Sequence, residues 1–303
     1  MGSRQEPLSA ALADALAAVE AAVAHVARPL DLHDWDPVAR EDKARILSRG
    51  RDELTPHDLY MYVVEGPNEL PLHEAQWFLP ALCRHLACCK TCGDPVGSEF
   101  AFGLLSQSGF PERWPDRSVA AVERFLSALV ADFLEYPDRW QASLGGEFED
   151  GLPLFFQMAE HGRIGLRSVV DGAAAVPEAA LARAIARWTL HTHPPSYDLI
   201  GGEGFEERAG QLAAHAFLSP GGMDFTKSWL VLQEPWIIIP RALEGETEPE
   251  WQDVLDEAAT LWAAAARDGR EGRAVSPWRS RSRYLRRYRA RPRRRSGPGP
   301  TTG

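Results

Sequence analysis

One short segment holds all four cysteines of the chain, and a histidine lies among them. Cys89 and Cys92 are separated by two residues and followed by Gly93, which is the form of a zinc knuckle. Two thiolates at this spacing can bind one ion where the backbone turns. A tetrahedral site would be completed by Cys88 or Cys83 and by His85, so the candidate metal ligands are His85, Cys88, Cys89 and Cys92.

The same cysteines also fit an interpretation without metal. A second Cys-x2-Cys or His-x3-His pair, which usually completes a structural zinc site, is absent from the sequence. Cys83 to Cys88 fall on a predicted helix with an apolar face, where cysteine behaves as a small buried apolar residue. We therefore expect no cofactor, with zinc as the alternative.

Two histidines near the end of another predicted helix form a weaker candidate metal site. In an extended segment His191 and His193 would share one face, with Asp198 or His215 as further ligands. Histidine at a helix C-terminus is also favoured by the helix dipole, and Pro194 ends the helix in either case. Both interpretations remain open.

Candidates for catalysis are incomplete. Glu147, Glu149 and Asp150 lie beside glycines, and paired carboxylates can act as general acid and base. A chain this acidic also places carboxylates together by chance. Residues 201–204, Gly-Gly-Glu-Gly, lack both a preceding strand and the Lys-Ser/Thr of a phosphate-binding loop. The sequence leaves open whether the protein is an enzyme.

The charge is divided between an acidic body and a basic tail. Residues 1–272 hold 22 basic and 43 acidic groups, a formal net charge of −21, whereas the remainder holds eleven arginines and no acid. The tail interleaves arginines with Trp278, Tyr284 and Tyr288, which suits phosphate contacts and base stacking. The candidate nucleic-acid-binding residues are Arg279, Arg281, Arg283, Arg286, Arg287 and Arg289. Two alternatives remain open. The tail lies against the acidic body, or it is translated from a GC-rich reading frame beyond an original stop codon.

Helical spacing of apolar residues dominates the rest of the chain. Leu8 to Val26 show it most clearly, with Ser9 as N-cap, and Thr55 and Pro56 mark another helix start. Pro80 is a candidate kink or break, and Asp116 is expected to cap a strong helix. Helices are predicted at 8–26, 38–48, 56–65, 72–88, 98–106, 116–134, 153–160, 178–190, 204–218, 225–233 and 249–267.

These elements predict an all-α protein, built as a multi-helix bundle or as stacked antiparallel helical pairs, with a disordered basic C-terminal tail. Residues 236–239, Trp-Ile-Ile-Ile, look like a strand between two prolines, and we expect a buried extended connector there. The large tryptophans are expected mainly in helix packing. The expected units are 1–140, 141–270 and the tail 271–303, with a soft boundary in the glycine-rich, acidic stretch between Trp140 and Pro153.

Two short motifs resemble a group of uncharacterised bacterial helical proteins. Residues 54–59, Leu-Thr-Pro-His-Asp-Leu, match a Leu-Thr-x-x-Asp-Leu start, and residues 78–82, Phe-Leu-Pro-Ala-Leu, match a Phe-Leu-Pro-x-Leu helix. The resemblance covers roughly residues 45–135. It implies a helical fold and no known activity.

The sequence favours a helical interaction module that acts as an adaptor or antagonist of another protein. The alternatives are a metal-binding module or metal-dependent enzyme at the cysteine segment, and nucleic-acid binding through the tail. No segment has the roughly 20 consecutive apolar residues needed to span a bilayer. The N-terminus lacks the charged segment followed by an apolar segment that is typical of a signal peptide. We therefore expect a cytoplasmic protein without membrane contact, from a GC-rich bacterial genome.

Overall fold

The computed structural model describes residues 8–33, 40–63, 69–87, 102–136, 151–191, 209, 213 and 218–271. Within these ranges the chain forms helices and turns without any strand, so the predicted all-α class is confirmed for this part of the protein. The Arg-rich tail lies outside the described residues. In the part described, no helix is both long and apolar enough to cross a lipid bilayer.

The helices are α1 (Ala10–Ala22), α2 (Arg40–Ser48), the 3-10 turn η1 (Arg51–Glu53), α3 (Pro56–Val63), α4 (Leu72–Ala87), α5 (Gly103–Gln107), α6 (Asp116–Glu135), α8 (Leu152–His161), α9 (Arg167–Ala173), α10 (Glu178–His191), α12 (Pro220–Leu232), α13 (Pro235–Gly245) and α14 (Pro249–Glu271).

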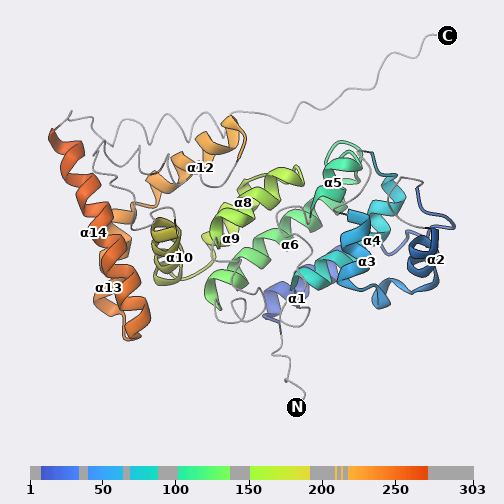
Figure 1. Cartoon of the computed structure of the whole chain (residues 1–303), viewed down its shortest axis with the longest axis horizontal. Helices are drawn as coiled ribbons and strands as arrows, with labels where there is room; N and C mark the ends of the chain where they lie inside the picture. The colour runs from blue at the N-terminus through green and yellow to red at the C-terminus, as the bar shows by residue number, and fades with distance from the viewer. Residues whose placement is uncertain are drawn as a thin grey trace, which may run out of the picture.

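The helices are arranged in an elongated row (Figure 1). Helices α2 to α5 lie at one end, the long helix α6 lies in the middle between α1 and α9, and α10 with α12, α13 and α14 forms the other end. Helix α10 packs on α13 and α14 and also contacts α6 and α8. The buried apolar residues form one cluster that runs through the row. Whether residues 1–140 and 141–270 are separate units stays a prediction.

Several helix starts follow from their capping residues. The Ser9 hydroxyl accepts a hydrogen bond of 3.3 Å from the Leu12 N–H, which confirms Ser9 as the N-cap of α1. Asp116 is the first helical residue of α6, and Pro115 is the N-cap, so the predicted cap is wrong by one position. Pro115 is extended, which suits the residue before a helix, and the Asp116 carboxylate still interacts favourably with the helix dipole from the first turn. Of the predicted helix at 204–218, residues 209, 213 and 218 are described. Ala209 and Ala213 are helical and buried, whereas Leu218 is buried but lies outside any helix.

The segment predicted as an extended connector, residues 236–239, is helical instead and forms the start of α13. Pro235 occupies the first helical turn, where its missing N–H costs nothing. The Ile238 N–H donates to the Glu234 carbonyl at 3.1 Å, which closes the first turn. Ile238 and Ile239 are buried in the core. Tertiary packing therefore overrides the strand preference of the isoleucines.

Proline also fails to break α4. The helix runs from Leu72 to Ala87 through Pro80, and nearly every residue in its middle is buried. Pro80 has no backbone N–H to donate to the preceding turn of the helix. Its ring is buried in the core, and the helix continues through it. The short helix α9 was not predicted, because its seven residues give too few turns for a periodic signal.

A buried hydrogen-bond chain fixes α10 against α14. Trp262 is fully buried, and its indole Nε1–H donates to the Thr189 hydroxyl at 3.0 Å. That hydroxyl donates to the Ile185 carbonyl at 2.7 Å. The buried indole thus has its polar group satisfied, and α14 is held in one position along α10.

The crossing of α6 and α9 depends on one glycine. A Cβ on Gly172 would lie 2.3 Å from the Ser127 carbonyl oxygen and 2.8 Å from the Val130 Cβ, so the two backbones approach closely. We expect Gly172→Ala to lower the free energy of unfolding by about 1–3 kcal/mol, because α9 must shift away from α6. Urea unfolding measures the change. Gly221→Ala in α12 is the matched control, since no atom lies within 4 Å of its added Cβ, and it should stabilise the helix slightly. Equal effects at both positions would contradict the close approach.

Candidate functional site

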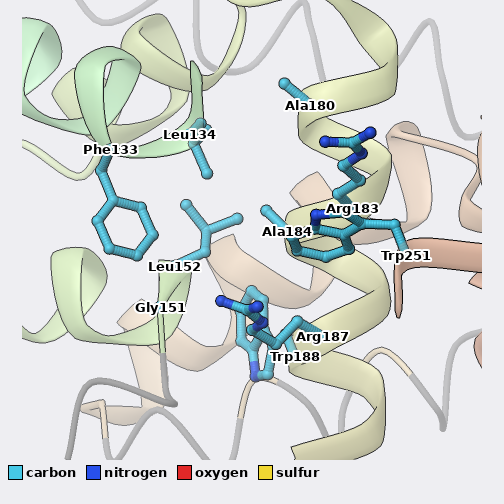
Figure 2. A pocket seen from close by; sticks show the side chains of 10 residues that line it. All are labelled: Phe133, Leu134, Gly151, Leu152, Ala180, Arg183, Ala184, Arg187, Trp188 and Trp251. Atoms are coloured by element: carbon cyan, nitrogen blue, oxygen red, sulfur yellow. The ribbon is translucent and has the colours of Figure 1, made fainter. Parts of the chain in front are cut away.

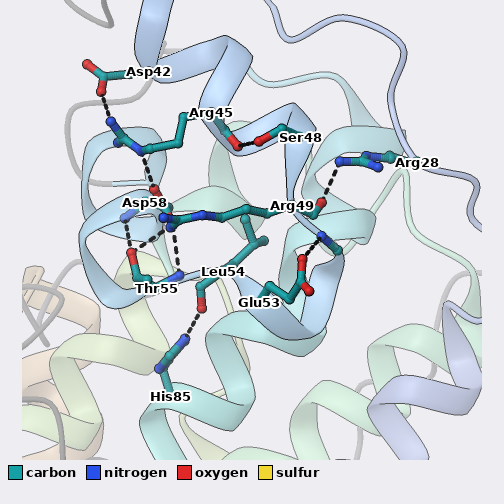
Figure 3. A network of polar contacts seen from close by, with 11 residues as sticks. Arg28, Asp42, Arg45, Ser48, Arg49, Glu53, Leu54, Thr55, Asp58 and His85 are labelled. Atoms are coloured by element: carbon teal, nitrogen blue, oxygen red, sulfur yellow. Dashed lines mark hydrogen bonds and ion pairs between the residues drawn. The ribbon is translucent and has the colours of Figure 1, made fainter.

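The described part of the predicted cysteine site has structural roles. His85 lies on α4, and its Nε2 is 2.7 Å from the Leu54 carbonyl oxygen, so it joins α4 to the segment before α3 (Figure 3). Cys83 is fully buried, and burial raises the pKa of its thiol far above the ordinary value, which the nearby charge of Arg84 offsets only in part. Such a thiol is inert. Cys88, Cys89 and Cys92 lie outside the described residues, so the zinc site stays a prediction.

The other predicted sites fall mostly outside the described ranges. This holds for His193, Asp198, His215, the acidic residues 147–150, the glycines 201–204 and all six tail arginines. His191 is the last residue of α10. Within the described ranges, no three His, Cys, Asp or Glu side chains gather as a metal-binding group. The expected packing role of the tryptophans is confirmed for those that are described and buried: Trp77, Trp114, Trp188, Trp229, Trp251 and Trp262.

A buried carboxylate organises the turn before α3 (Figure 3). The Thr55 hydroxyl accepts a hydrogen bond from the Asp58 N–H at 3.2 Å. Asp58 Oδ2 in turn accepts from the Thr55 N–H at 2.9 Å and from the Thr55 hydroxyl at 2.7 Å. This reciprocal pairing is a capping box with an aspartate in the third position. It gives the Leu-Thr-x-x-Asp-Leu motif a structural explanation.

Arg45 of α2 and Arg49, the residue just after the end of α2, complete this cluster. Arg45 Nε donates to Asp58 Oδ1 at 3.1 Å, and Arg49 Nη1 binds Asp58 Oδ2. Burial would raise the pKa of Asp58, but the Thr55 N–H and hydroxyl and the two guanidiniums together lower it below its usual range. The carboxylate therefore stays ionised, and both of its oxygens are already bound. The cluster joins α2 to α3 and offers no open position for a substrate.

A pocket lies where the middle of the row meets its C-terminal end (Figure 2). The atom-free space beside its lining residues is about 350 Å³, a volume that includes open solvent. One side comes from the end of α6 and the start of α8, and the facing side comes from α10 and α14. The residues of α10 recur at spacings of three, one, three and one, which places them on one helical face. The lining residues are Phe133, Leu134, Gly151, Leu152, Ala180, Arg183, Ala184, Arg187, Trp188 and Trp251.

Two guanidiniums stack on one indole at the edge of this pocket. The Cζ atoms of Arg183 and Arg187 lie 5.0 and 4.7 Å from the centre of the Trp251 ring. Both distances fall within the range of cation–π interactions. The two arginines are four residues apart on α10, so helical geometry places them side by side. Trp251 is contributed by α14, which the Trp262 hydrogen bond holds in position.

Arg183 is oriented by carboxylates of the turn between α13 and α14. Its Nε donates to Glu246 Oε2 at 2.8 Å, and its Nη2 lies 2.6 Å from that oxygen and 3.1 Å from Glu248 Oε1. Burial opposes ionisation of Glu246, but the backbone N–H groups of Glu248 and Thr247 and the Arg183 guanidinium lower its pKa overall. An ionised Glu246 therefore fixes the guanidinium plane of Arg183 beside Trp251.

The described residues that line the pocket are mainly apolar, with two arginines among them. None of these ten residues is a nucleophile or a general acid or base. Because the 350 Å³ includes open solvent, the enclosed space is much smaller than the roughly 300–1,000 Å³ typical of ligand pockets. The pocket therefore suits contact with the surface of a partner better than a whole cofactor.

Little in the amino-acid sequence indicates this pocket. Arg183 and Arg187 are four residues apart on a predicted helix, which identifies a basic stripe, but their partner Trp251 is more than sixty residues away. No protein-family model, curated protein or solved structure matches this chain.

Proposed function

We propose that this protein is a helical interaction module and that it binds a partner protein at the pocket between α6, α8, α10 and α14. The observation that supports this function is the composition of the pocket. Trp251 and two arginines stand at its edge, and apolar side chains form its floor. Tryptophan and arginine are enriched among the residues that dominate binding energy in protein interfaces, and such residues cluster in well-packed pockets.

The position of the pocket supports the same function. Its two sides come from parts of the chain that are held together by the shared core, so the pocket is preformed. A preformed pocket on rigid helices lowers the entropic cost of binding. Ala184 and Ala180 line it with small side chains from α10, so that this side of the pocket stays open to the surface of a partner.

Filling the pocket tests this function. We expect Ala184→Phe to reduce retention of the partner by at least roughly thirtyfold, the effect of losing a hot-spot contact of about 2 kcal/mol. The measurement is quantitative affinity purification of the tagged full-length protein from its native cells, followed by mass spectrometry. Ala180→Phe is a second filling variant, which covers the case that one of them unfolds.

The matched control is Ala179→Phe, which adds the same side chain to an exposed position of α10 outside the pocket. At least one protein should be retained by the wild type and by Ala179→Phe and lost from both filling variants. If every captured protein stays on the folded filling variants, or if none is captured at all, the pocket is not a partner site.

A further inference from the structure

We propose that the exposed face of α14 docks the arginine segment of the same chain, residues 273–295. This face lies across the helix from Trp251, the residue that α14 contributes to the pocket. Docking there is therefore independent of the proposed function.

Helix α14 has one buried and one acidic face. The buried side chains recur at spacings of four, three and four on the side that lies against α10 and α13: Trp251, Leu255, Ala258 and Trp262. At about 100° per residue, the exposed carboxylates fall on the opposite side of the helix: Glu250, Asp253, Asp256 and Glu257. Their spacings of three, three and one place them close together. The face that α14 turns to solvent is therefore strongly negative.

These four carboxylates are not offset by nearby bases. None of them makes an ion pair or a hydrogen bond within the part of the chain that the structure describes. Glu246 and Glu248 differ, because both bind Arg183. Residues 242–266 contain seven acids and no basic residue, so this stretch supplies no cation of its own. Like charges on one helical face destabilise it, and an opposite charge placed there relieves the repulsion.

The chain supplies that opposite charge directly after α14. The helix ends at Glu271, and the arginine segment that follows holds eleven arginines and no acid. From Glu250 to Glu271 the helix rises about 32 Å, a distance that about ten extended residues cover. The arginines from Arg281 onward can therefore reach every carboxylate of the exposed face.

Attachment to the same helix favours this occupant over a separate molecule. One exposed ion pair stabilises little, so docking needs several at once. A short connection raises the effective concentration of the arginine segment at the helix into the millimolar range. A metal ion is disfavoured, because no three His, Cys, Asp or Glu side chains gather as a metal site in the described ranges. A nucleic acid would be repelled by the carboxylates.

Digestion of the full-length protein with trypsin tests the docking, because trypsin cleaves after accessible arginines. The α14 variant combines Asp253→Asn, Asp256→Asn and Glu257→Gln. In about 0.01 M salt, we expect the arginine segment of the wild type to be cleaved at least about threefold more slowly than that of the α14 variant. In about 1 M salt the difference should vanish, because the Debye length falls to about 3 Å. Mass spectrometry measures the rate at each arginine.

The matched control removes three charges elsewhere, through Asp14→Asn, Glu69→Gln and Glu112→Gln. These acids are exposed on α1, before α4 and between α5 and α6, away from the end of the row that α14 forms (Figure 1). The control has the same net charge as the α14 variant, and its arginine segment should be cleaved at the wild-type rate. Circular dichroism checks that both variants are folded.

Three outcomes would overturn the docking. Equal cleavage of the wild type and the α14 variant at low salt would show that the face holds nothing. Equal acceleration in both triple variants would show an effect of net charge alone. Protection that is lost on dilution would assign the occupant to a second copy of the chain. Each of these leaves the pocket as a partner site, because none of the substituted residues lines it.

Discussion

Replacing Asp58 by alanine is expected to lower the free energy of unfolding by about 3 kcal/mol. The Asp58 side chain is almost fully buried and binds Arg45, Arg49 and Thr55 at once. Its loss leaves the Thr55 N–H and two guanidiniums without their common acceptor. The effect falls at the lower end of the range for a broken buried ion pair, because the arginine side chains remain 36% and 33% exposed and can turn to water. Urea unfolding followed by circular dichroism measures it.

Asp42→Ala is the matched control for this prediction. Asp42 binds Arg45 from the opposite side and is itself partly exposed, so its removal should cost less than about 1 kcal/mol. Similar losses from Asp42→Ala and Asp58→Ala would mean that Asp58 is not the centre of the cluster.

The pH dependence of stability provides an independent check on Asp58. Its pKa is lower in the folded protein than in the unfolded chain, where an aspartate titrates at roughly 3.9. The ionised carboxylate therefore stabilises the protein above the unfolded pKa, and this contribution is lost as the pH falls through the lower folded value. The stability difference between the wild type and Asp58→Asn should shrink as the pH falls below about 4. A difference that stays constant would contradict the lowered pKa.

Trp262→Ala is expected to cost about 3–5 kcal/mol, the range for truncating a large buried aromatic side chain. The indole is fully buried, packs beside Trp236 at a centroid distance of 6.2 Å, and donates to Thr189. Its removal leaves a cavity between α10 and α14, and the Thr189 hydroxyl loses the hydrogen bond it accepts while it keeps the one it donates to the Ile185 carbonyl. Thermal and urea unfolding measure the loss.

Conservative variants separate the packing of Trp262 from its hydrogen bond. Trp262→Phe keeps much of the apolar volume and should cost about 1–3 kcal/mol through the lost bond and the smaller ring. Trp262→Phe and Thr189→Val together form a double-mutant cycle. The loss in free energy of unfolding of the double variant should be smaller than the sum of the losses of the two single variants. Strict additivity would show that the hydrogen bond between the two side chains contributes nothing.

Most helices of the described part could be predicted from the sequence, because their signals are local. Ser9 and Thr55 are N-caps whose partners lie three residues away, and the apolar stripe of α6 recurs over twenty residues. Where the predicted secondary structure was wrong, contacts with residues far away in the sequence determined the structure. Ile238 and Ile239 favour a strand locally, but burial of both side chains in the core selects α13.

The candidate site could not be predicted in the same way. Arg183 is visible in the sequence as one of many arginines, and only folding brings it beside Trp251 and Glu246. For His85 the sequence pattern indicated a role that the structure does not show among the described residues. Its spacing from the cysteines predicts a metal ligand, yet its ring contacts the carbonyl of Leu54, which belongs to a separate segment. Residue types and spacing identify candidates, and the packing of α10 on α14 determines which side chains form the pocket.

The most direct test of the pocket as a partner site is the spectrum of the tryptophan indole N–H groups during titration with the partner protein retained in the affinity purification. Trp188 and Trp251 line the pocket, and their signals can be assigned with Trp188→Phe and Trp251→Phe proteins. Trp114 is an internal reference, because its Nε1–H is bound to the Ser108 hydroxyl in the segment between α5 and α6, whereas the pocket lies at the opposite end of α6. We expect the Trp188 and Trp251 signals to shift with a common affinity while Trp114 stays in place. Saturable binding that leaves the Trp188 and Trp251 signals unmoved would contradict the proposed site.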